Sequence, residues 1–84
     1  MSEYNGYKSY AHWNTALWIN NDEGFHDVML NEVEFVVYQH YTLDTAVEKV
    51  LDELPELTPD REKWQRSTLK EVMLENYAEQ LRYS

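Results

Sequence analysis

The residues of this chain that could perform acid–base or metal chemistry are three histidines and a large number of carboxylates. The histidines are His12, His26 and His40, each 14 residues from the next. No pair therefore has the i, i+4 spacing that places two imidazole rings on one helix face for a metal ion. We expect a structural or surface role for each histidine, and the sequence predicts no metal site.

The sixteen Asp and Glu side chains do not form a recognisable catalytic pair. General acid–base catalysis needs a carboxylate whose surroundings shift its pKa, and the pattern singles out none. The run Asn20–Gly24 resembles half of a calcium loop but lacks the distal bidentate Glu, and helix capping explains the same residues. The chain also has no Gly-x-Ser-x-Gly motif and no glycine-rich phosphate loop. The sequence thus predicts no catalytic residue, no cofactor and no enzymatic activity.

The carboxylates are instead concentrated in the middle of the chain. Residues 22–60 hold eleven acids and one base, whereas residues 1–21 balance to zero and residues 61–84 to +1. Such a field repels nucleic acid and anionic lipid and steers basic partners toward the protein. The predicted acidic binding face consists of Glu32, Glu34, Asp44, Glu48, Asp52, Glu53 and Glu56. An alternative interpretation is that these charges only keep the protein soluble.

A second candidate for binding is the concentration of aromatic residues near the N-terminus. Nine of the twelve aromatic residues lie within residues 4–41, more than a core of this size easily buries. We expect Trp13, Trp18 and Phe25 to be core residues. Tyrosine combines apolar area with a polar tip and is common at protein interfaces. The predicted aromatic contacts with a partner are therefore Tyr4, Tyr7, Tyr38 and Tyr41.

Helices are expected to position these candidates, within a single domain that spans residues 1–84. Ser9 is suited to cap a first helix over residues 10–20, and a second helix is predicted over residues 22–40. The segment 33–41 is also rich in β-branched and aromatic residues, which leaves a short strand there as an alternative.

Proline and threonine punctuate the second half of the chain. Thr42 is suited to cap a third helix, which Pro55 ends. Thr58 and Pro59 have the pattern of an N-cap followed by proline at the first helical position, which predicts a fourth helix from there to about Arg82. The sum is an all-α, compact bundle of about four helices. The expected inner face of the fourth helix comprises Trp64, Leu69, Val72, Met73, Tyr77 and Leu81.

The compartment is inferred from what the sequence lacks. It has no cysteine, no apolar run of the roughly 18 residues that span a bilayer, and no basic and apolar signal segment at its N-terminus. We expect a cytoplasmic protein.

The opening of the chain carries a family resemblance. Residues 4–24 resemble the Y-N-G-W-x-N-x-x-T-W-x-x-x-L-W-I-x-N-D-E-G opening of a domain family of unknown function found in bacteriophages and mobile elements. Trp13, the run Leu17–Ile19 and the run Asn21–Gly24 match that pattern, whereas Tyr7, Ser9 and His12 depart from it. The resemblance implies a phage or mobile-element origin and a helical fold, and it supplies no catalytic residues.

Together these observations favour a binding protein over an enzyme. The leading hypothesis is a phage-type inhibitor, such as an anti-CRISPR or other anti-defence protein. Its acidic face would block a basic nucleic-acid-binding surface of a host protein, acting in the host cytoplasm without contacting nucleic acid or membrane directly. The alternative is a homo-oligomeric structural or accessory phage protein, a homodimer for example, with the surplus aromatic residues between its copies.

Overall fold

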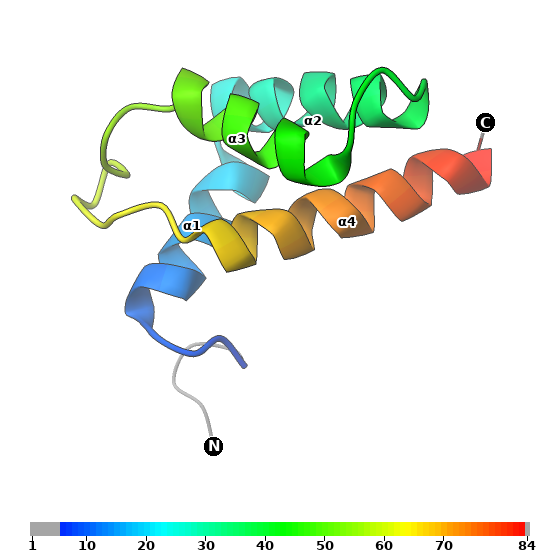
Figure 1. Ribbon diagram of the computed structural model, residues 1–84. Helices are drawn as coiled ribbons and strands as arrows, with labels where there is room; N and C mark the ends of the chain where they lie inside the picture. The colour runs from blue at the N-terminus through cyan, green and yellow to red at the C-terminus, as the bar shows by residue number, and fades with distance from the viewer. Residues whose placement is uncertain (1–5, 84) are drawn as a thin grey trace.

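The computed structural model describes residues 6–83, and four helices account for most of them. They are α1 (Tyr10–Asn21), α2 (Glu23–Val37), α3 (Leu43–Glu53) and α4 (Arg66–Tyr83). Helices α2 and α3 lie side by side, and α4 passes below both, while α1 descends from the start of α2 at a steep angle (Figure 1). The predicted all-α bundle is confirmed. Within the described residues, the one extended pairing is an isolated antiparallel bridge between Leu57 and Lys63.

Side-chain caps define where the first three helices begin. The side chains of Ser9, Asp22 and Thr42 each accept a hydrogen bond from a backbone N–H in the first turn that follows. Caps of this kind each stabilise a helix by about 1 kcal/mol. Only Asp22 separates α1 from α2, so the chain changes direction there within a single residue. The prediction that Ser9 and Thr42 cap helices is confirmed, since both side chains accept such a hydrogen bond.

The segment 33–41 continues α2 and then turns, so the alternative of a strand there is wrong. Met29, Val33 and Val36 are buried at helical spacing, and packing of this one face against the core outweighs the β-propensity of the individual residues. The helix ends at Val37, three residues earlier than predicted, and Gln39 adopts a positive φ of 63° just beyond it. A left-handed residue at this place commonly ends a helix.

The predicted start of the fourth helix at Thr58 is also wrong, since α4 begins at Arg66. Residues 54–65 form an irregular connection, which we call the α3–α4 loop. Within it, the Arg61 N–H donates to the Thr58 carbonyl at 2.8 Å, and Arg61 has a φ of 66°. Pro59 thus occupies the second position of a tight turn, where its fixed φ suits the backbone as well as it would in a helix.

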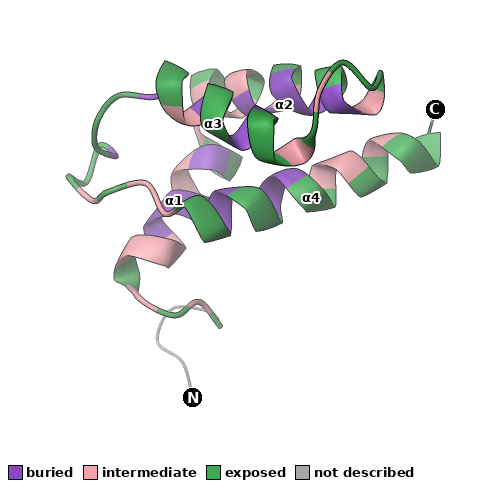
Figure 2. Ribbon diagram, in the orientation of Figure 1, coloured by how far each residue is buried: buried purple, intermediate pink, exposed green. Residues whose placement is uncertain are grey.

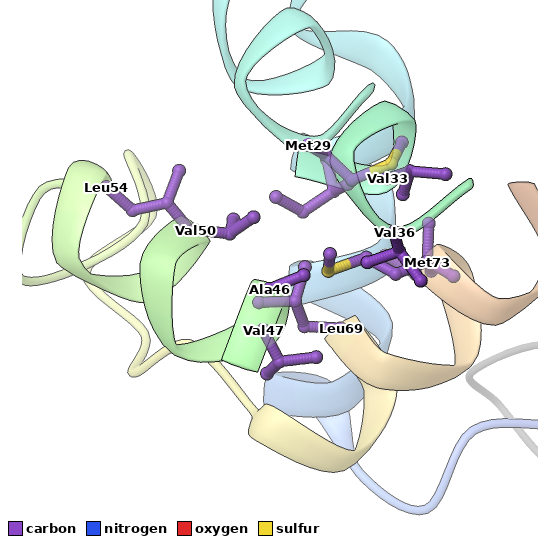
Figure 3. Close-up of a cluster of buried hydrophobic side chains, with 12 residues drawn as sticks. Met29, Val33, Val36, Ala46, Val47, Val50, Leu54, Leu69 and Met73 are labelled. Carbon is purple, nitrogen blue, oxygen red and sulfur yellow. The ribbon is translucent and has the colours of Figure 1, made fainter. Parts of the chain in front are cut away.

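The hydrophobic core lies where α2, α3 and α4 meet, with two residues contributed by α1 (Figure 3). It contains Ala16, Ile19, Met29, Val33, Val36, Ala46, Val47, Val50, Leu54, Leu69, Val72 and Met73. Burial of α4 is confined to its first half, because its buried residues are Thr68, Leu69, Val72 and Met73. Beyond them the helix continues with exposed and half-buried residues (Figure 2). Of the four helices in residues 6–83, none has the length and apolar character needed to cross a membrane.

Candidate functional site

A hollow on the surface formed by α2 and α3 brings together four of the seven predicted acidic residues. The larger part of this hollow has a volume of about 460 Å³, and a second part has a volume of about 330 Å³. The two parts adjoin, since Glu32 and Glu53 line both. We call the two parts the acidic groove. Its lining comprises Asn31, Glu32, Glu34, Phe35, Tyr38, His40, Lys49, Asp52 and Glu53.

Glu32 is the most deeply placed carboxylate of the groove, with 9% of its surface exposed. The Tyr41 hydroxyl donates a hydrogen bond to Glu32 Oε1, which offsets part of the cost of burying a carboxylate. The pKa of Tyr41 is raised above its ordinary value, mainly by burial. The hydrogen bond to Glu32 and the negative charges of Glu32 and Glu53 raise this pKa further. Lys49 Nζ lies 5.2 Å from the centre of the Tyr41 ring. Tyr41 is therefore the hydrogen-bond partner of Glu32 and does not itself line the groove.

Exposed aromatic rings border these carboxylates. Phe35 is 45% exposed and Tyr38 is 66% exposed, although both lie on or next to a helix that packs against the core. The centre of the Phe35 ring lies 5.5 Å from the His40 ring and 5.7 Å from the Tyr41 ring. An apolar, aromatic surface beside carboxylates suits an arginine or lysine side chain, because the stem contacts the ring while the charged end pairs with an acid.

Two of the predicted acidic residues on α3 lie outside the groove and have cationic partners. The Lys70 ammonium is 2.7 Å from Asp44 Oδ1, and Arg66 forms an ion pair with Glu48. The hydrogen bond and charge of Lys70, with a smaller effect of Arg66, hold the pKa of Asp44 below its usual range. Asp44 and Glu48 thus join α3 to α4. The seven acidic residues of the predicted face therefore do not all lie at one hollow.

The remaining predicted contacts are dispersed. Glu56 borders a separate hollow beside Trp64, and Tyr7 borders another hollow with Trp13 and Leu17. Tyr4 lies outside the described residues. Of the predicted tyrosines, Tyr38 lines the acidic groove and Tyr41 supports it through Glu32.

A polar network between α1 and the α3–α4 loop was not predicted from the sequence. Asn14 is fully buried; its amide donates to Asp60 Oδ2 at 2.6 Å, and its oxygen accepts from the Thr58 hydroxyl at 2.7 Å. The Trp18 indole donates to the same Asp60 oxygen at 2.9 Å. These two donors, Asn14 first and Trp18 second, lower the pKa of Asp60. The one available signal was two adjacent polar residues, Asn14 and Thr15, in a helix expected to be widely buried.

The histidines are engaged locally rather than with one another. His12 Nδ1 lies 2.9 Å from the Ser9 hydroxyl, and His26 Nδ1 lies 3.1 Å from the Ile19 carbonyl oxygen. Over residues 6–83, no group of three or more His, Asp or Glu side chains is arranged to hold a metal ion. The acidic groove, by contrast, has a geometry that suits the binding of cationic side chains.

Comparison with known proteins identifies one family. The model of a family of unknown function (DUF7249) matches residues 1–83, nearly the whole chain. No curated protein and no solved structure shows significant similarity to the chain. The description of the family assigns no activity.

Proposed function

The chain belongs to DUF7249, a family of unknown function, and we propose that it inhibits a host protein by binding a basic, nucleic-acid-binding surface. The observation that carries this proposal is the acidic groove, whose two adjoining parts are lined by four carboxylates and two exposed aromatic rings. A phage-encoded anti-defence protein of the anti-CRISPR type is the form of inhibitor that we propose.

Long-range electrostatics supports a basic partner. The chain carries a net charge of -9, and Glu34, Asp52 and Glu53 are exposed at the groove. A channel lined with Lys and Arg attracts the phosphates of nucleic acid, and a surface of carboxylates attracts the same cations. Complementary charge of this kind mainly raises the association rate and excludes other partners.

Affinity requires a contribution beyond exposed charge, because salt screens exposed ion pairs. Phe35 and Tyr38 supply it in this proposal. Large aromatic side chains that become buried on association are the most frequent source of binding energy at protein interfaces. Their placement beside Glu34 and Glu53 allows one arginine of the partner to contact a ring and a carboxylate together.

The test compares two pairs of charge reversals with the same change in net charge. In the first pair, Glu34→Lys and Glu53→Lys reverse two carboxylates that line the groove. In the control pair, Glu23→Lys and Asp27→Lys reverse exposed carboxylates that do not line it. Each protein is tagged and used to capture partners from bacterial lysate at low and at moderate salt.

We expect the wild type and the control pair to retain one stoichiometric protein that binds nucleic acid, and added salt to weaken that retention. The groove pair should lose it. Adding the wild type to the captured protein should then displace its nucleic acid, and adding the groove pair should not. Retention of the same partner by the groove pair, or no partner at all for the wild type, would contradict the proposal.

A further inference from the structure

The second half of α4 has no fully buried residue over about three turns, although Tyr77 packs against the edge of the core. Burial in this helix ends at Met73, and every residue from Leu74 to Tyr83 is exposed or half-buried. In Figure 1 this part of α4 extends past the turn that joins α2 to α3. Helices in proteins gain most of their stability from packing of one face, so a segment with so little burial is a candidate for contact with a partner.

Apolar side chains form a stripe on the outer side of this segment. Leu74 is 50% exposed and Leu81 is 46% exposed, and they are separated by seven residues, or about two turns. Ala78 lies between them on the same stripe, where its small side chain leaves room for a close neighbour. Next to the stripe, a hollow of about 490 Å³ is lined by Val36, Gln39, Tyr41, Thr42, Leu43, Leu74 and Tyr77.

The charge distribution argues for the occupant of this surface. Two molecules with a net charge of -9 repel one another, so they associate only through a face without excess negative charge. Residues 74–83 of α4 carry little excess charge, because they hold two acids, Glu75 and Glu79, and one base, Arg82, whereas α2 has four acids and no base. We propose that the second half of α4 pairs in antiparallel orientation with the same segment of a second copy of this chain.

The positions of the charged residues fit this pairing. Successive residues of an α-helix are rotated by about 100° around its axis. Glu71, Glu75 and Arg82 therefore lie along the same flank of the apolar stripe. In an antiparallel pair of identical helices, the same flank of each helix meets. When Leu74 of one copy faces Leu81 of the other, Arg82 comes within a turn of Glu71 and Glu75 of the second copy. A two-fold axis repeats this contact, as expected of a closed dimer.

This inference is independent of the function proposed for the acidic groove. The larger part of the acidic groove and the hollow beside α4 share no lining residue. The surface proposed for the dimer and the acidic groove are therefore formed by different residues in each copy.

Sedimentation equilibrium tests the dimer itself. The wild type should sediment with twice the monomer mass of 10.1 kDa, and Leu74→Glu with Leu81→Glu should weaken association at least tenfold. Leu57→Glu, a matched change at an exposed leucine of the α3–α4 loop, should leave association unchanged. Circular dichroism of each variant verifies that the helices are retained.

A charge exchange tests the identity and orientation of the partner. Arg82→Glu alone, and the pair Glu71→Arg with Glu75→Arg alone, should each weaken self-association, because like charges then meet on the flank. Mixing the two variants should restore a dimer, since opposite charges meet again. A wild type that stays monomeric up to about 1 mM would overturn the proposal. So would undiminished association of the leucine double variant, or failure of the mixed variants to pair.

Discussion

The hydroxyl of Thr58 donates a 2.7 Å hydrogen bond to the side-chain oxygen of Asn14, although the two residues lie 44 positions apart in the chain. The Asn14 amide donates in turn to Asp60, so this fully buried side chain has partners for both its donor and its acceptor. A polar side chain satisfied in this way connects α1 to the α3–α4 loop in one defined geometry.

Replacing Asn14 should therefore destabilise the protein more than its small volume suggests. Asn14→Ala removes both hydrogen bonds and leaves the buried Thr58 hydroxyl without its acceptor, which should lower the free energy of unfolding by about 1–3 kcal/mol. Urea denaturation measures the loss. Asn20→Ala, at an exposed asparagine of the same helix, is the control and should change stability by less than about 0.5 kcal/mol. Equal effects of the two changes would show that the network contributes nothing.

Asp60 should make the protein sensitive to acid. Its pKa in the folded state is lowered by the donors Asn14 and Trp18, so the folded state favours the charged carboxylate. The associated stability is present above the ordinary Asp pKa of about 3.9 and is lost as the pH falls below it. Asp60→Asn should thus reduce stability at neutral pH and flatten its decline in acid, as measured by thermal melts from pH 7 to pH 2. Asp44→Asn removes the effect of the Lys70 pair in the same way and separates the two contributions.

Tyr41 should make the protein sensitive to alkali. Its pKa is raised by burial and by Glu32, so its contribution to stability is present below the ordinary tyrosine pKa of about 10 and is lost as the pH rises above it. Absorbance titration of the phenolate should show one tyrosine that ionises later than the others. In Tyr41→Phe this late component should disappear. If it persists, another tyrosine is responsible and the contact with Glu32 has no such effect.

The aromatic rim of the acidic groove should carry much of the affinity in the proposed inhibitor. Tyr38→Ala removes a ring that is 66% exposed, so the fold should be little affected while binding to the captured partner weakens tenfold or more. Tyr83→Ala removes another highly exposed tyrosine, outside the groove, and should leave the affinity unchanged. Isothermal titration calorimetry distinguishes the two. If the affinity of Tyr38→Ala is unchanged, the Tyr38 ring contributes nothing to binding and this prediction is wrong.

The helices that local signals define could be predicted from the sequence. Ser9 and Thr42 do cap α1 and α3, and α3 ends just before Pro55. Hydrophobic spacing also predicted that α2 would continue past Val33, although β-branched residues there favoured a strand. In each case the deciding interaction spans a few residues, so the sequence displays it directly.

Interactions between distant segments could not be predicted in this way. The pair Thr58–Pro59 suits the start of a helix and a tight turn equally well. In the structure it forms the turn, and the Thr58 hydroxyl donates a hydrogen bond to Asn14, which is far away in the chain. The acidic face shows the same limit. Whether Asp44 meets Lys70 depends on how α3 and α4 align, which no local pattern specifies.

The anchoring of the α3–α4 loop has a consequence for how the protein moves. A connection of twelve residues without helix or strand is normally where proteases cut and where neighbouring elements rotate against each other. Here the loop is attached to α1 at Asn14, and the Gln65 N–H, one residue before α4, donates to the Thr15 hydroxyl at 2.9 Å. These contacts with α1 define the direction in which α4 leaves the loop, so we expect the longest loop of the described chain to restrict rotation of α4 rather than permit it.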